Sequence, residues 1–188
     1  MKLAVILSFL AFFVTSASAQ KNDIPKSIAE SVGGPMQWSE DQFYSVAEAM
    51  PEDKYDYVPT AGNFKDVRSF AEQVKHVACV QFGFFNQIDG KTPPDDCEKG
   101  GHAPAKTKAE LLKYLKDSFD YGNKVLSTIN AKNALDRVDG RYAGPSTKLG
   151  MAVIAVLHIN DHYGQIVEYL RMNGIVPPIT QKYGLKVR

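Results

Sequence analysis

Hydrophobic side chains recur at three- and four-residue spacings in four stretches of the chain, separated by segments rich in polar residues, Gly and Pro. This period is typical of α-helices that bury one face. The pattern predicts helices over about 37–50, 67–88, 106–129 and 146–172. No stretch alternates apolar and polar residues convincingly, as a half-buried strand would. We therefore expect an all-α protein built as a four-helix bundle.

In the first of these helices, acidic residues occupy the side opposite the apolar positions. The apolar set is Trp38, Phe43, Val46, Ala47 and Met50, and the polar set is Glu40, Asp41 and Glu48. Ser39 is a candidate N-cap, because acidic and amide residues follow it. Pro25 and the pair Gly33-Gly34 argue against an earlier helix start. Residues 20–36 are therefore expected to be a leader to a domain that spans residues 37–188.

The other three helices carry recognisable start and stop signals. Ser69 is a candidate N-cap for the second helix. Thr107-Lys108-Ala109-Glu110 fits a capping box at the start of the third. Ser146, after Gly144-Pro145, can cap the fourth, and Asn173-Gly174 followed by Pro177-Pro178 ends it near Met172.

The N-terminus has the pattern of a cleavable export signal. Lys2 precedes an almost wholly apolar run from Leu3 to Val14, and Ala17-Ser18-Ala19 matches a cleavage site before Gln20. The apolar run of about a dozen residues is shorter than the roughly 20 needed to span a bilayer. Residues 1–19 are therefore expected to be removed, leaving a periplasmic or extracellular protein without a membrane segment. An uncleaved N-terminal anchor is the alternative.

Charge and cysteine content narrow the picture further. Without Lys2 the chain has 21 basic and 21 acidic side chains, and no basic stripe suggests a nucleic-acid partner. In an exported protein, Cys79 and Cys97 favour a disulfide, which would stabilise the fold by roughly 3 kcal/mol. The alternative is that Cys79, one helical turn after His76, is a free thiol near a metal.

The candidate chemistry lies in histidines on two of the predicted helices. His158 and His162 are four residues apart, so they project from one face and can bind the same metal ion. If the second helix is a neighbour, His76 can join them inside the bundle, where metal sites are commonly built. Three imidazoles leave a coordination position for water, as in catalytic rather than structural sites. The alternative is that these are ordinary core or boundary histidines.

Other metal and catalytic motifs are absent. Ile159 and Asn160 follow His158, so the H-E-x-x-H motif of a zincin protease is missing. Glu72 lies four residues before His76, and Gln73 stands at the third position, which disfavours a ferritin-like di-iron site. No haem, P-loop, dinucleotide or serine-hydrolase motif is present. No residue can be named as catalytic acid or base.

Residues around the histidines have secondary roles in this interpretation. Gln165, three residues after His162, could hold an imidazole or a substrate, or form a hydrogen bond between helices. Gly164 would permit close helix packing. Asn160, Asp161 and Tyr163 on the fourth helix are expected to serve packing or the surface, and the loop residue His102 is expected to be solvated. Tyr55 and Tyr57, in the link after the first helix, are expected to pack in the core; the alternative is that they lie over the pocket.

Three segments, in order along residues 37–174, resemble the DinB superfamily. The first is the acidic, tyrosine-bearing link Met50-Pro51-Glu52-Asp53-Lys54-Tyr55-Asp56-Tyr57-Val58-Pro59. The second is Arg68-Ser69-Phe70, which leads along the second helix to His76. The third is the run from His158 to His162-Tyr163-Gly164-Gln165, similar to an H-x-x-x-H-x-G-Q signature.

This resemblance implies an up-down-down-up four-helix bundle, frequently a homodimer, that holds zinc or nickel through His76, His158 and His162. Characterised relatives include thiol-dependent S-transferases and isomerases. A metal-dependent hydrolase or S-transferase acting on an unidentified small molecule is therefore expected. Export separates this chain from cytosolic low-molecular-weight thiols, which weakens the S-transferase analogy. The alternative is a non-catalytic metal-binding or stress-associated bundle.

Overall fold

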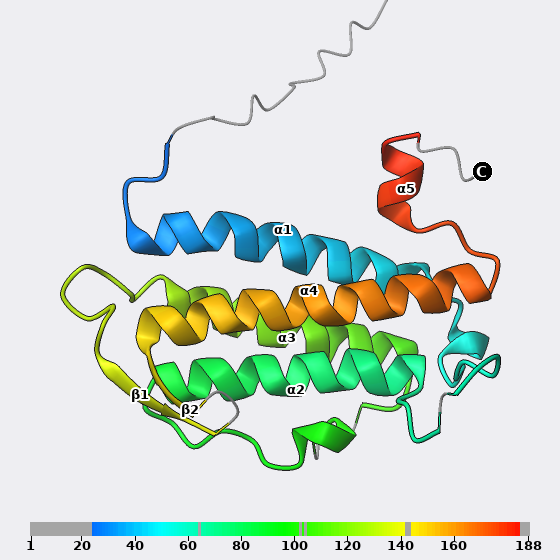
Figure 1. Ribbon diagram of the computed structural model, residues 1–188, viewed down its shortest axis with the longest axis horizontal. Helices are drawn as coiled ribbons and strands as arrows, with labels where there is room; N and C mark the ends of the chain where they lie inside the picture. The colour runs from blue at the N-terminus through cyan, green and yellow to red at the C-terminus, as the bar shows by residue number, and fades with distance from the viewer. Residues whose placement is uncertain (1–23, 64, 102, 104, 142–143, 185–188) are drawn as a thin grey trace, which may run out of the picture.

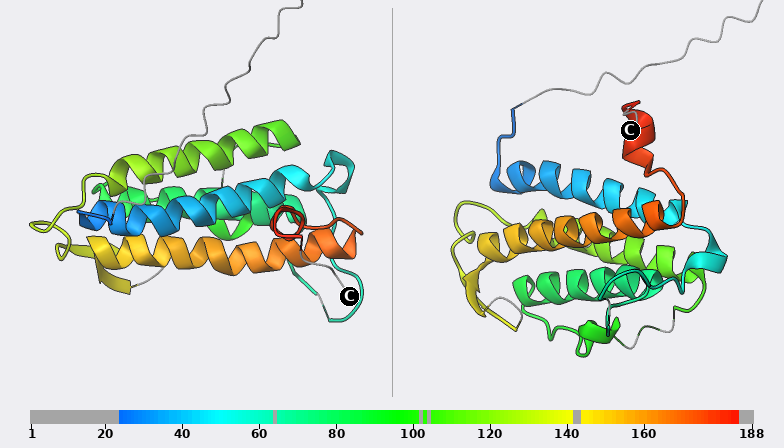
Figure 2. Two further views of the ribbon diagram at one scale, coloured as in Figure 1. Left: turned by 90° about the horizontal axis from the view of Figure 1, so that it is seen from above. Right: turned by 45° about the vertical axis from the view of Figure 1, so that its right-hand side comes forward.

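Four long helices form the body of the protein. The computed structural model describes residues 24–63, 65–101, 103, 105–141 and 144–184. The helices are α1 (Ile28–Ala49), α2 (Phe70–Ile88), α3 (Lys108–Leu126) and α4 (Lys148–Met172). Helices α1 and α4 run in one direction and α2 and α3 in the other (Figure 1, Figure 2). The expected up-down-down-up bundle is confirmed.

Helix neighbours in the bundle form a closed square. Helix α1 packs against α3 and α4, and α2 packs against the same two helices. The α1–α3 and α2–α4 interfaces therefore lie on opposite sides of the bundle (Figure 2). Within the described ranges, no helix combines the length and apolarity that crossing a membrane would require. The expected export signal, residues 1–19, lies outside those ranges, as does His102.

Short elements connect the long helices. Two 3₁₀ turns, η1 (Glu52–Lys54) and η2 (Cys97–Lys99), lie in the links before and after α2, and α5 (Pro178–Lys182) follows α4. The strands β1 (Arg137–Gly140) and β2 (Gly144–Thr147) pair antiparallel before α4. The expectation of no strand was wrong here. Each strand has four residues, too few to show a period of two, and Val138 is the only buried side chain among the eight.

Helix α1 begins at Ile28 rather than near residue 37. Ser27 caps it by accepting a hydrogen bond from the Glu30 backbone N–H. Pro35 lies inside the helix, where the missing N–H costs one backbone hydrogen bond. The expectation that Ser39 caps the helix was wrong. Its buried hydroxyl donates to the Pro35 carbonyl (2.9 Å) and accepts from Asn160 Nδ2 (2.7 Å), which links α1 to α4.

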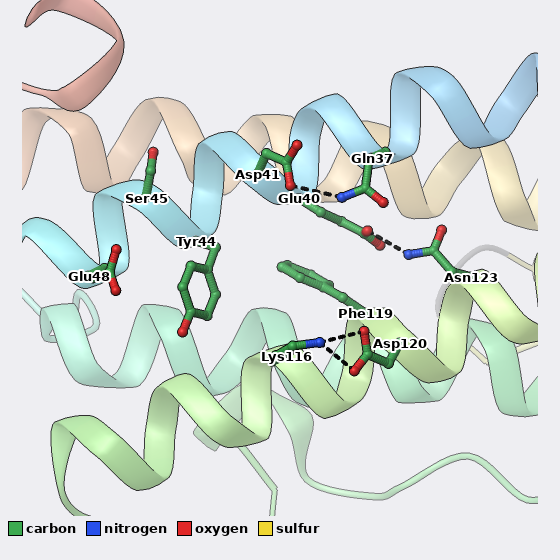
Figure 3. A pocket seen from close by; sticks show the side chains of 10 residues that line it. All are labelled: Gln37, Glu40, Asp41, Tyr44, Ser45, Glu48, Lys116, Phe119, Asp120 and Asn123. Carbon is green, nitrogen blue, oxygen red and sulfur yellow. Dashed lines mark hydrogen bonds and ion pairs between the residues drawn. The ribbon is translucent and has the colours of Figure 1, made fainter. Parts of the chain in front are cut away.

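The buried face of α1 also differs from the expected one. Trp38, expected in the core, is 55% exposed, whereas Glu40, expected on the polar side, is 3% exposed. The reason is that α3 covers a second face of α1. Asn123 on α3 donates a hydrogen bond from Nδ2 to Glu40 Oε2 (2.7 Å) across this interface (Figure 3).

The apolar core consists of two clusters along the bundle. One is centred on Phe43, Phe70, Leu115, Ile159 and Leu170, and the other on Met36, Phe85, Leu126, Met151 and Ala155. The helices come very close at Gly122 on α3. A Cβ atom there would lie 2.9 Å from the Phe85 ring and 3.0 Å from Met36 Cε. Gly122 therefore sets the spacing between α3 and its two neighbours.

Capping confirms most of the expected helix boundaries. Ser69 and Thr107 each form a complete capping box, with Glu72 and Glu110 respectively. Helix α4 ends at Met172 as expected, but Thr147 rather than Ser146 caps its start. Ser146 instead pairs with Val138 in the hairpin.

Candidate metal centre

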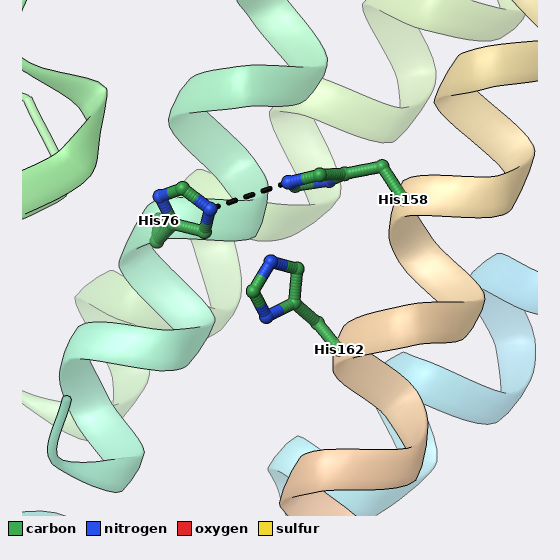
Figure 4. A group of neighbouring side chains, drawn as sticks. All are labelled: His76, His158 and His162. Atoms are coloured by element: carbon green, nitrogen blue, oxygen red, sulfur yellow. Dashed lines mark hydrogen bonds between the residues drawn. The ribbon is translucent and has the colours of Figure 1, made fainter. Parts of the chain in front are cut away.

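Helices α2 and α4 bring three histidines to one point in their interface. His76 comes from α2, and His158 and His162 come from successive turns of α4 (Figure 4). One ring nitrogen from each lies within 4.8 Å of those of the other two. His76 and His162 are buried, and His158 is partly buried. Among the described residues, no other group of His, Cys, Asp or Glu side chains converges in this way.

Hydrogen bonds fix the orientation of two of the three rings. His76 Nδ1 lies 2.7 Å from the Cys97 carbonyl oxygen, and His162 Nδ1 lies 2.8 Å from Gln73 Oε1. Because both oxygens only accept, both Nδ1 atoms carry the proton. The Nε2 atoms of His76 and His162 therefore present lone pairs, as metal-ligating imidazoles do.

His158 completes the group with a different environment. Its Nδ1 is buried and has no protein partner, while its Nε2 lies 3.2 Å from His76 Nε2. Two nitrogens that share one tetrahedral zinc ion are about 3.3 Å apart, given metal–nitrogen distances of about 2.0 Å. The observed separation thus fits a pair of ligands. It fits equally a hydrogen bond in which His158 donates to His76.

Burial keeps the three rings neutral. Desolvation is the largest cause in each case, and it lowers the pKa of His76 below the usual range. The pKa of His158 falls to about 2 and that of His162 to about 3, with the neighbouring histidines and Arg68 adding repulsion to the charged form. Neutral imidazole is the form that binds a metal ion.

A chain of side-chain amides extends from the triad to the surface. Gln73 Oε1 accepts from His162 Nδ1, and Gln73 Nε2 donates to Gln165 Oε1 (2.9 Å). Gln165 in turn donates through its own Nε2 to Asp161 Oδ2 (3.0 Å). Gln165 thus forms a hydrogen bond between α4 and α2, and it is connected to His162 only through Gln73. Sequence reasoning missed Gln73, although its position three residues before His76 places both on one helix face.

The two cysteines form a disulfide between α2 and η2. The expected pairing of Cys79 with Cys97 is confirmed, and the free-thiol alternative is wrong. The bond holds the loop segment whose Cys97 carbonyl orients His76. Cys97, which had no metal-binding role in the sequence interpretation, therefore positions the candidate ligand His76 through its backbone carbonyl.

A cavity of about 410 Å³ opens beside His76 and His158. Its wall is largely apolar, formed by Val80, Phe84, Ile154 and Leu157, and its two carboxylates come from Glu98 and Asp161. Glu98 forms an ion pair with Arg68, which also donates from Nε to the Glu98 carbonyl oxygen (2.9 Å). Asp161, expected to face elsewhere, is exposed but lines this cavity. Sequence reasoning did not place Arg68 or Glu98 at the site.

The remaining candidates lie away from the triad. Tyr55 is a core residue whose hydroxyl donates to the Ala47 carbonyl (2.6 Å), and Tyr57 packs edge-on against Tyr169. Both were expected to serve packing, which is confirmed. The interpretation of Gly164 as a close-packing residue was wrong, because a Cβ atom there would meet nothing within 4 Å.

Comparisons with known proteins relate both the sequence and the fold to DinB-like proteins. A family model described as the DinB superfamily matches residues 36–166. A DinB-like protein from Bacillus cereus ATCC 10987 superposes with a TM-score of 0.65 and 12% identity, covering 82% of this chain and 98% of that one. A conserved protein from Enterococcus faecalis gives a TM-score of 0.61 and 16% identity, covering 77% and 95%. At these identities, the two structures support the fold alone. The search of curated proteins gave no match.

Proposed function

The chain belongs to the DinB superfamily, and on that basis we propose that it binds one divalent metal ion through His76, His158 and His162. The observation that carries this proposal is the orientation of the rings. Acceptors hold Nδ1 of His76 and His162, so their Nε2 atoms carry lone pairs that can bind a metal ion where the three rings meet. Zinc and nickel both suit three neutral imidazoles.

We further propose that the site acts on a small molecule by hydrolysis or group transfer. The ion would serve as a Lewis acid toward a molecule bound beside it. The apolar wall around Leu157 would hold that molecule and exclude water. Asp161 and Glu98 line the same cavity, and a carboxylate there can take up a proton. Asp161 is the better candidate, because Arg68 already binds Glu98.

A non-catalytic metal-binding protein is the second candidate. Both carboxylates of the cavity already have protein partners, since Gln165 donates to Asp161 and Arg68 pairs with Glu98. Such partners stabilise the surroundings of a bound ion without requiring a reaction.

We also propose that the protein functions outside the cytosol. Two observations support this location: the signal-like pattern of residues 1–19 and the disulfide between Cys79 and Cys97. Disulfides persist mainly in oxidising compartments. Sequencing the N-terminus of protein recovered from an expression host tests the proposal, because a cleaved chain would begin at Gln20.

Elemental analysis of protein purified without chelators tests the metal proposal. Wild type is expected to carry about one equivalent of zinc or nickel, and a His158→Ala variant is expected to lose it. A His102→Ala variant is the matched control, because it removes the one histidine outside the triad. Full metal occupancy in His158→Ala would exclude the three-histidine site.

Turnover measurements separate the two candidate functions. Metal-loaded wild type is assayed on a panel of small esters, thioesters and thiols, beside His158→Ala and Asp161→Asn. Turnover that both variants reduce supports an enzyme that uses the cavity. Inert protein with a full equivalent of metal supports the non-catalytic candidate.

A further inference from the structure

A second cavity lies between α1 and α3, on the side of the bundle opposite the histidine triad. Its volume is about 330 Å³, at the lower end of the range of small-molecule sites. Its lining combines a buried carboxyl group, aromatic rings and charged side chains: Glu40, Tyr44, Lys116, Phe119, Asp120 and Asn123 (Figure 3). Neither the metal site nor its neighbouring cavity uses any of these residues.

Glu40 is the unusual member of this group. Its side chain points from α1 into the space between the two helices (Figure 3) and is 3% exposed. Asn123 donates to Oε2, but no protein atom donates to the buried Oε1. A buried polar atom without a partner is costly, so a donor brought by a ligand would be stabilising there.

The charges around Glu40 favour a positively charged ligand. Asp41 and Glu48 from α1 and Asp120 from α3 line the cavity, against the single cation Lys116. Both carboxylate oxygens of Asp120 already bind Lys116 Nζ, at 2.8 and 2.6 Å. Burial is the main cause that raises the pKa of Glu40 to about 8, and Asp41 and Asp120 add to it while Asn123 and Lys116 oppose it.

The spacing of the carboxylates argues against a metal ion in this cavity. Among the described residues, only the histidine triad brings three ligand atoms within 4.8 Å of one another. An organic cation tolerates wider spacing, because its apolar part can occupy the rest of the cavity. Tyr44 and Phe119 provide aromatic surface against which that apolar part can pack.

We propose that the cavity between α1 and α3 binds a small organic molecule with a primary ammonium group. The ammonium group donates a hydrogen bond to Glu40 Oε1, and the apolar part of the molecule lies against Phe119 and Tyr44. A charge-assisted hydrogen bond of this kind requires the ionised carboxylate. Binding below pH 8 is therefore coupled to proton release from Glu40.

Titration calorimetry with benzylamine near pH 8 tests the proposal on the purified protein. Wild type is expected to bind it, and Glu40→Gln is expected to bind it at least about tenfold more weakly. Glutamine keeps the shape and removes a buried acid, so this variant should fold. Glu168→Gln is the matched control, since it makes the same change at an exposed position of α4 and should leave binding unchanged.

Two analogues of benzylamine test the hydrogen bond itself. Benzyltrimethylammonium keeps the charge without an N–H donor, and benzyl alcohol keeps a donor without the charge. Each is expected to bind at least about tenfold more weakly than benzylamine. The proposal is overturned if wild type does not bind benzylamine, if Glu40→Gln binds it as well as wild type does, or if the trimethyl analogue binds equally tightly.

Discussion

His76 Nδ1 lies 2.7 Å from the carbonyl oxygen of Cys97, and the Cys97 side chain is bonded to Cys79, which follows His76 by three residues on α2. The disulfide and this hydrogen bond thus both attach the η2 segment to α2. The orientation of a candidate metal ligand therefore depends on the oxidation state of two residues that do not contact the ion site directly.

Removing the disulfide is expected to weaken metal binding. In a Cys79→Ala/Cys97→Ala variant the η2 segment is free to move, so His76 loses its fixed acceptor. Loss of such a partner typically lowers metal affinity by about 10-fold to 100-fold. Stability should also fall by roughly 3 kcal/mol. Competition with a chromophoric chelator measures the first effect and urea unfolding the second. Unchanged affinity in the folded variant would mean that η2 does not orient His76.

Gln73→Leu is expected to weaken metal binding without removing a ligand. The substitution takes away the oxygen that holds His162 Nδ1 and the bond to Gln165. We expect a loss in affinity of about 10-fold to 100-fold, measured by the same chelator competition. Gln73→Glu keeps an acceptor for His162 and should retain more of the affinity than the leucine variant. Equal losses in the two variants would contradict this role.

Gln81→Met is expected to stabilise the protein. Gln81 is fully buried on α2, and neither its Oε1 nor its Nε2 has a protein partner. Replacing an unpaired buried amide by an apolar side chain of similar length removes a penalty of roughly 1–3 kcal/mol. Urea unfolding should therefore show a higher midpoint for Gln81→Met than for wild type. A lower midpoint would show that the amide makes a favourable interaction.

Glu40→Gln is expected to stabilise the protein near pH 8 and to have little effect near pH 4. The folded-state pKa of Glu40 is raised from 4.5 to about 8, so the native state binds a proton that the unfolded state releases. The contribution of Glu40 is fully present below pH 4.5 and is lost as the pH rises through 8. Near pH 8, the free energy of unfolding of the variant should exceed that of wild type by roughly 2–4 kcal/mol. Unfolding curves across this range, with Glu168→Gln as control, measure the difference. A pH-independent effect would contradict the raised pKa.

Two glycine-to-alanine substitutions are expected to act in opposite directions. At Gly122 the new Cβ would press against Phe85 and Met36, so Gly122→Ala should destabilise the protein by roughly 1–3 kcal/mol. At the exposed, open position of Gly164, alanine should stabilise α4 by roughly 0.5–1 kcal/mol. Thermal unfolding measures both effects: the unfolding temperature should fall for Gly122→Ala and rise for Gly164→Ala. A stable Gly122→Ala protein would show that α3 can move away from its neighbours.

Helix starts that depend on residues close together in the sequence could be predicted from the sequence. Ser69 and Thr107 start helices because each is followed three residues later by a glutamate, and both capping boxes are present. The helical spacing predicted that His158 and His162 share one face, whereas the addition of His76 depended on the condition that its helix is a neighbour and on the resemblance to the DinB superfamily. The same local reasoning gave a wrong start for α1, because the poor helix propensity of Gly33-Gly34-Pro35 argued against a helix there. Tertiary packing of α1 outweighs that propensity.

Contacts between distant segments could not be predicted from the sequence. Glu40 sits where a surface carboxylate is expected, and only the approach of α3 with Asn123 buries it. Gln73 has the right spacing to His76, yet its partner is His162, 89 residues away. Arg68 and Glu98 meet through the η2 loop rather than through any periodic pattern.

The division of the triad between α2 and α4 has a consequence for folding in the presence of metal. His158 and His162 are neighbours along the chain and can hold an ion weakly even when the protein is unfolded, whereas His76 joins them only after the two helices dock. A ligand stabilises the native state only by its preference for that state over the denatured one. Metal addition should therefore raise the unfolding temperature by less than the native affinity alone implies. In a His76→Ala variant, whose remaining pair binds in both states, that increase should nearly vanish.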